Sequence, residues 1–169
     1  TSIHGGRADS IFSDIVIEYK IKGTFKSKKG RDEAVYGRDA KDRGLKHYLI
    51  NFTLDEYTAA AIDDSIFCSR IVNKVGIGFD GEAMIIARFV PDETPQDIFS
   101  DKKTKKLPKQ LSEKMPLRLV VEFIDDLEVA FKKMVLLLRS TDRYCLSSKN
   151  LIKEFGPGSE ICRETIQYL

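Results

Sequence analysis

The segment at residues 74–90 (KVGIGFDGEAMIIARFV) constrains the fold more than any other part of the sequence. Asp80-Gly81 is a turn signal between two apolar arms, which predicts a β-hairpin. The second arm, AMIIARF, is almost wholly apolar, as expected of a strand that is covered on both faces. A strand of this kind needs a packing layer on each side, and it indicates a sheet that is flanked by helices.

The N-terminal half of the chain supplies further elements for such a fold. Alternation of apolar and polar residues over 10–22 predicts a strand, and the Gly-, Ser- and Lys-rich stretch 23–31 is typical of a loop. Residues 32–51 predict a helix that is broken at one glycine. The sequence Thr53-Leu-Asp-Glu56 fits a capping box, so we expect another helix to start there.

The C-terminal half predicts a linker followed by helices. Residues 91–116 contain four of the five prolines and six lysines, which favours a solvated connection. Apolar residues recur every three or four positions over 117–139, which predicts a long helix. Either Ser147 or Ser148 is expected to cap a short helix, and Ser159 is expected to cap a last one. We therefore expect an α/β core at 1–90, a linker at 91–116, and a helical segment at 117–169 that leads to a downstream domain.

Composition excludes several classes of protein. The net charge of +2 does not mark a nucleic-acid binder by itself, and a hydrophobic content of 42% excludes wholesale disorder. The three cysteines are far apart, which favours reduced thiols in the cytoplasm, and two isolated histidines do not make a structural zinc site. No apolar run reaches transmembrane length, so we expect no membrane partner. Because the chain opens at Thr1 without a methionine, we expect a fragment of a larger protein.

The segment HGGRADSIFSDIVIEYK at 4–20 contains the candidate site. Glu18 and Lys20 are two residues apart, so on a strand they project from one face. A bend at 10–14 could return Asp9 to the same place. Two converging carboxylates bind Mg²⁺, with Mn²⁺ as a substitute, and a neighbouring lysine stabilises developing negative charge. These are the components of metal-assisted phosphodiester hydrolysis.

The motif GRAD…DIVIEYK resembles the PD-(D/E)xK nuclease motif, the active site of many restriction endonucleases. The resemblance implies a restriction-endonuclease-like mixed sheet and a magnesium-dependent DNA endonuclease. It also implies that Asp9 and Glu18 are the acids, that Lys20 is the catalytic lysine, and that the carbonyl of Tyr19 is a further metal ligand. Ala8 stands where the family usually has proline.

Two later stretches extend the resemblance to restriction–modification proteins in which the nuclease is fused to an adenine methyltransferase. GIGFDGEAMIIARF resembles the strand pair that closes their nuclease core, and SSKNLIKEFGPGS resembles the connection toward their methyltransferase. The implied partners are double-stranded DNA and a downstream methyltransferase domain of the same chain.

Basic residues near the motif are candidates for contact with the DNA backbone. They are Arg7, Lys26, Lys28, Lys29 and Lys46. Asp14 is an alternative to Asp9 as a metal ligand, and His47 is a weaker candidate for a general base.

Other interpretations of the same residues stay open. Glu18 and Lys20 could form an ordinary ion pair on a solvated strand face. The fold could be a catalytically inactive nuclease module that binds DNA or organises an assembly, or an α/β interaction domain with no role in nucleic-acid binding. The apolar stripe of 117–139, separated from a neighbouring domain, could drive formation of a homodimer.

Overall fold

A computed structural model describes residues 2–3, 6–7, 10–12, 14–38, 43–57, 62–99 and 110–140. The chain divides into two compact units, Thr1–Ala130 and Phe131–Leu169, and the description of the sheet concerns the first of them. None of the described helices combines the length and apolar character that crossing a membrane requires.

Seven strands, four α-helices and one 3-10 helix lie in the part of the chain that the structure describes. Their order is β1 (Ser2–Ile3), β2 (Gly6–Arg7), β3 (Ser10–Phe12), β4 (Ile15–Tyr19), η1 (Thr24–Lys26), α1 (Lys28–Tyr36), α2 (Leu45–Asp55), α3 (Asp64–Ile71), β5 (Val75–Phe79), β6 (Met84–Gln96), β7 (Met115–Ile124) and α4 (Leu127–Ser140).

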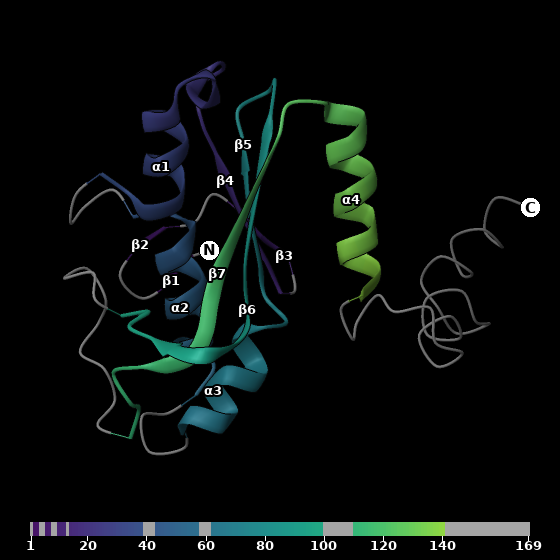
Figure 1. Ribbon diagram of the computed structural model, residues 1–169. Helices are drawn as coiled ribbons and strands as arrows, with labels where there is room; N and C mark the ends of the chain where they lie inside the picture. The colour runs from purple at the N-terminus through teal and green to yellow at the C-terminus, as the bar shows by residue number, and fades with distance from the viewer. Residues whose placement is uncertain are drawn as a thin grey trace, which may run out of the picture. The chain divides into compact units, whose positions relative to one another are not determined.

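The main sheet has five strands in the order β3-β4-β5-β6-β7, and β1 and β2 form a separate pair. Strands β4 and β5 are parallel, and every other neighbouring pair in the sheet is antiparallel. Helices α1, α2 and α3 form the crossover between β4 and β5, and α1 and α2 lie along one face of the sheet (Figure 1). The observed architecture is therefore α/β with a mixed sheet, as the sequence predicts.

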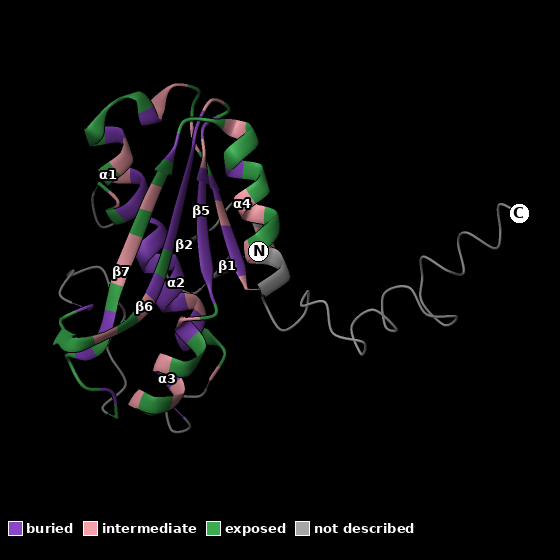
Figure 2. Ribbon diagram, turned by 45° about the vertical axis from the view of Figure 1, so that its right-hand side comes forward, coloured by how far each residue is buried: buried purple, intermediate pink, exposed green. Residues whose placement is uncertain are grey.

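The predicted hairpin is present, and both of its arms are mostly buried near the turn. Phe79 pairs with Met84 across the turn, and Gly81 takes a φ of +85° that favours glycine. From Met84 to Ala87 every residue of β6 is buried, and Figure 2 shows this arm in the colour of buried residues. The buried arm contributes Ile85 and Ala87 to a core cluster beneath α1 and the start of α2, and a larger cluster lies between the sheet and helices α2 and α3.

Three expectations about the first helices are wrong in detail. The predicted loop at 23–31 contains η1 and the start of α1, because the Ser27 side chain accepts a hydrogen bond from Gly30 N and caps that helix. The broken helix is two helices separated at Gly37 and Gly44. Thr53 does not cap a helix, since it lies inside α2 and its hydroxyl donates to the carbonyl of Leu49.

The largest error concerns residues 117–124, which form strand β7 rather than a helix. β7 pairs with β6, which itself extends through the predicted linker as far as Gln96. Ile98, Phe99 and Leu111 from that linker are buried in the core. Helix α4 begins only at Leu127. The predicted short helices after residue 141 lie outside the described residues.

Gly44 offers a test of the junction between α1 and α2. A Cβ atom on this residue would overlap the backbone carbonyl of Val35 and would crowd the nitrogen of Gly37. We expect Gly44→Ala to lower the free energy of unfolding by about 1–3 kcal/mol, because backbone must move to accept the methyl group. Urea unfolding measures this change. An unchanged midpoint would show that α1 and α2 do not approach each other as closely as described.

Candidate functional site

Glu18 and Lys20 lie next to each other at the C-terminal end of β4. The Nζ atom of Lys20 lies 2.9 Å from Oε1 of Glu18, and the side chains are 20% exposed for Lys20 and 10% for Glu18. The pair is therefore mostly shielded from solvent. This contact differs from an exposed surface ion pair, which contributes little because water competes for both charges.

The strand periodicity determines which face carries this pair. Val16, two residues before Glu18, packs in the core cluster that includes residues of α2, so Glu18 projects toward the helix-covered face. Gly78 of β5 is directly opposite Glu18, and a Cβ there would lie 3.1 Å from the ring of Phe25. The absence of a side chain at Gly78 leaves room for Phe25 beside the site. The backbone of Lys20 continues the ladder by donating to the carbonyl of Phe79.

A pocket of about 240 Å³ opens beside Lys20. Its other walls come from the segment after β4, from α1 and from Arg38; they are Ile21, Thr24, Gly30, Glu33, Ala34 and Arg38. The Glu33 carboxylate lies 4.0 Å from Nε of Arg38 and 3.8 Å from Nζ of Lys29. The pocket therefore has a lysine from the sheet on one side and a paired carboxylate and guanidinium on the other.

Exposed cations follow the site along η1 and α1. The side chains of Lys22, Lys26 and Lys29 are 75%, 74% and 86% exposed. Lys22 and Lys26 both pair with Glu82 in the β5–β6 turn. The hydrogen bond with Lys26 lowers the pKa of Glu82, and the same contact raises the pKa of Lys26. Both groups stay charged at neutral pH, so the surface retains its positive side chains.

The structure brings together only some of the predicted site residues. Glu18 and Lys20 are in contact, and the exposed Tyr19 side chain projects from the other face of β4. Lys28 and Lys29 are exposed in the first turn of α1. Asp9, the expected first acid, lies outside the described residues, as does the side chain of Arg7.

Three other candidates are largely buried or paired elsewhere. Lys46 is 9% exposed and His47 is fully buried, both in α2, and their expected roles stay predictions. Asp14 pairs with the buried Lys74 at the start of β4, at 3.3 Å. Four residues along a strand correspond to about 13 Å, so Asp14 does not replace Asp9 beside Glu18.

Comparisons with known proteins return no relative. No family model matches the chain, and no curated protein or solved structure matches it. Within the described ranges there is also no group of three or more histidine, cysteine, aspartate or glutamate residues that could hold a metal ion. The part of the candidate site that the structure describes therefore consists of the Glu18 carboxylate, Lys20 and the adjoining pocket.

Sequence reasoning missed Glu33 as a neighbour of Lys20, and it preferred Lys46 to Arg38 among the basic residues that follow the motif. The signal for Glu33 is the pair of small residues Gly30 and Ala34, spaced four apart, which share one face of α1 and are both buried. If Ser27 had been recognised as a helix cap, a helix starting at Lys28 with Gly30 and Ala34 on its buried face would have been predicted. The lysine-rich composition of 26–31 instead suggested a loop.

Proposed function

We propose that this chain is a magnesium-dependent DNA endonuclease domain of the PD-(D/E)xK type, in which Glu18 and Lys20 are part of the active site. The observation that supports the proposal most directly is the shielded contact between these two side chains at the end of a sheet strand. An acid and a lysine held in a fixed geometry are suited to the stabilisation of charge that develops on a phosphate.

The proposed second acid, Asp9, directly precedes strand β3 in the chain. Strand β3 is the neighbour of β4, the strand that carries Glu18, and Ile11 of β3 packs against the same core cluster as Val16 of β4. This nearness in sequence and the motif that Asp9 shares with Glu18 and Lys20 support its role in the proposed site, which the metal titration tests.

The residues have separate roles in the proposed reaction. The oxygen atoms of Asp9 and Glu18, with the carbonyl of Tyr19, would hold Mg²⁺, which prefers such hard ligands and supplies Lewis acidity at the phosphate. Lys20 orients the attacking water and balances negative charge on the phosphate oxygens. Glu18, the oxygen donor that the structure describes, fits this cation. Its side chain is only 10% exposed, so little water competes with the ion for the carboxylate oxygens.

The surface around the pocket fits a polyanionic substrate. Lys22, Lys26 and Lys29 are exposed close to Lys20 in the chain, and Arg38 lines the same pocket with 63% of its side chain exposed. Such cations contribute binding that does not depend on sequence and that falls steeply with salt. We propose that they hold the backbone of double-stranded DNA.

Calorimetric titration with Mn²⁺ tests the proposed metal site. We expect the wild-type chain to bind the ion, and the Asp9→Asn/Glu18→Gln variant to lose binding by at least about tenfold, because two ligand charges are removed. The control is Glu93→Gln/Glu113→Gln, which removes two exposed carboxylates elsewhere and should bind as the wild type does. Equal binding in all three proteins would contradict the assignment of Asp9 and Glu18.

A second candidate function is a nuclease-fold module without activity. It is favoured by the existing contact between the Glu18 carboxylate and Lys20, in a part of the chain where the structure describes no group of three or more possible metal ligands. Such a module would bind DNA with a steep salt dependence and would neither need Mg²⁺ nor cleave. Incubation of plasmid DNA with the chain, with and without Mg²⁺, separates the two functions.

A further inference from the structure

Strand β7 forms one edge of the sheet. Among the described residues it pairs with β6 alone, from Leu117 opposite Pro91 to Ile124 opposite Met84. It is long for an edge strand, and Val121 and Phe123 are 40% and 41% exposed. Figure 2 shows the contrast between this partly exposed strand and the buried arm of β6 beside it. A long apolar edge is a template for pairing with another strand.

The sequence of this edge is complementary to itself. In the segment LRLVVEF at 117–123, apolar residues lie at equal distances on both sides of the centre. The one positive residue and the one negative residue also lie at equal distances from it, on opposite sides. Val120 is its centre. In an antiparallel pair of two identical segments centred there, Arg118 of each copy would be opposite Glu122 of the other. Leu119 would be opposite Val121, and Leu117 would be opposite Phe123.

The charged residues of β7, Arg118 and Glu122, differ from charges that only protect an edge strand against pairing. Edge strands are commonly shielded by charged side chains, which repel a second copy when they carry the same sign. Here the two charges have opposite signs and lie four residues apart on the same face of β7. Arg118 also lies 3.4 Å from the Asp92 carboxylate of β6, yet 54% of its side chain stays exposed and within reach of a second copy. Direct opposition of unlike charges stabilises an antiparallel pair, and a two-fold axis makes each such contact twice.

We infer that β7 is a self-association surface, through which a second copy of this chain adds its own β7 in antiparallel orientation about Val120. The two sheets would become one continuous sheet. This inference does not depend on the proposed nuclease activity, because the residues that carry it are separate from the candidate site.

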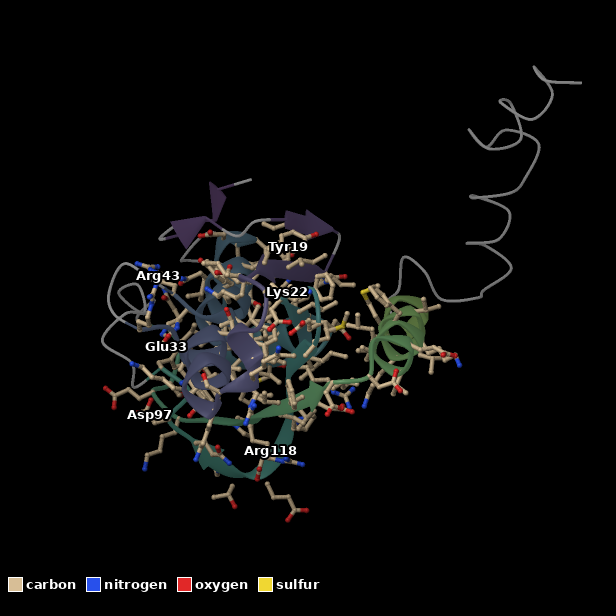
Figure 3. All side chains as sticks on the ribbon, turned by 90° about the horizontal axis from the view of Figure 1, so that it is seen from above. Tyr19, Lys22, Glu33, Arg43, Asp97 and Arg118 are labelled. Carbon is tan, nitrogen blue, oxygen red and sulfur yellow. The ribbon has the colours of Figure 1, made fainter. Side chains whose placement is uncertain are left out.

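The candidate site stays open in such a dimer. Figure 3 shows Arg118 on the β7 side of the sheet and Tyr19 on the β4 side. Two strands separate β4 from β7, which corresponds to roughly 14 Å between them at the usual strand spacing. The Arg31 guanidinium, 4.7 Å from the Phe123 ring centre, supports the end of β7 from α1. An added strand therefore meets an ordered edge.

Sedimentation velocity of the 169-residue chain over a range of concentrations tests the inference, with the variants Arg118→Glu and Glu122→Arg. We expect the wild type to dimerise as concentration rises. Each single variant should dimerise at least about tenfold more weakly, because it sets like charges opposite each other twice. An equimolar mixture of the two variants should form a heterodimer, since the two acidic side chains at positions 118 and 122 of one variant would then face the two basic side chains of the other.

The double exchange Arg118→Glu/Glu122→Arg provides the matched control, because it restores both charge pairs and should dimerise as the wild type does. Circular dichroism melts confirm that each variant is folded. A wild type that is monomeric at every concentration would overturn the inference. So would single variants that dimerise as well as the wild type, or a mixture of folded single variants that stays monomeric.

Discussion

Lys20→Ala is expected to lower magnesium-dependent cleavage of plasmid DNA by at least about a hundredfold. The reason is that the ammonium group lies 2.9 Å from the Glu18 carboxylate, beside the pocket where a phosphate would enter. Its removal eliminates a fixed positive charge from a site that is mostly shielded from water, and solvent does not replace such a charge well. The measurement is the initial rate of plasmid nicking under single-turnover conditions.

The matched control for this prediction is Lys114→Ala. Lys114 is an exposed lysine that directly precedes β7, and it belongs neither to the candidate site nor to the proposed DNA-binding cations. We expect its cleavage rate to stay within about twofold of the wild type, because an exposed side chain away from the site contributes little to folding or chemistry. Thermal melts of both variants separate a loss of chemistry from a loss of folding. Full activity of a folded Lys20→Ala protein would exclude the proposed role of Lys20.

Asp80→Ala is expected to cause a large loss of stability, about 3 kcal/mol or more in the free energy of unfolding. Asp80 is only 3% exposed, and its two carboxylate oxygens accept hydrogen bonds from the backbone of Phe25, Glu82 and Ala83. Alanine would leave these N–H groups without an acceptor. Because Phe25 lies in η1, the same carboxylate also ties the segment after β4 to the β5–β6 turn. Urea unfolding at neutral pH measures the loss.

The pH dependence of stability tests the same interactions. Burial raises the pKa of Asp80, but the hydrogen bonds from the backbone of Phe25, Glu82, Ala83 and Gly23 together outweigh burial and hold the pKa below its ordinary value. A depressed pKa means that the stabilisation is complete above the unfolded value of about 4 and is lost as the pH falls toward the native value. Asp80→Asn should therefore lack this part of the acid destabilisation.

Asp125→Ala is the control for both experiments. Asp125 and Asp80 line one surface pocket, separate from the pocket beside Lys20, but Asp125 is exposed. Its stability should lie within about 0.5 kcal/mol of the wild type at neutral pH. Its acid transition should also follow that of the wild type. If Asp80→Ala were as stable as Asp125→Ala, the carboxylate of Asp80 would not be the anchor of the turn.

The hairpin was predictable because its signals are local. The residues Asp80-Gly81 favour a hairpin turn and the apolar run of β6 favours a buried strand, and neither signal depends on distant parts of the chain. Strand β7 was not predictable in the same way, since residues 117–124 and the following helix form a continuous apolar pattern. Leu117, Leu119, Val121 and Phe123 fit alternation, yet Val120 and Ile124 also fit helical spacing. Only pairing with β6 decides between the two.

The site shows the same division between local and distant information. Alternation along β4 correctly places Glu18 and Lys20 on one face, because a strand period of two needs no tertiary structure. The burial of Lys46 and His47 depends on how the crossover helices pack, and the chain around them does not encode that packing locally. The metal ions, the DNA substrate and the role of Asp9 stay predictions.

The parallel pairing of β4 with β5 has a consequence for the order of folding. Ile15 pairs with Val75, so the whole crossover of α1, α2 and α3 must be arranged before this ladder can close. Closing a long loop costs entropy before its contacts are gained, which makes such a pairing a slow, late step. The hairpins β3–β4 and β5–β6 are joined by short turns and can form early. The contact between the β4 end and the crossover is therefore among the last features to mature, and slow-folding variants of α2 would delay the site even when their final stability is normal.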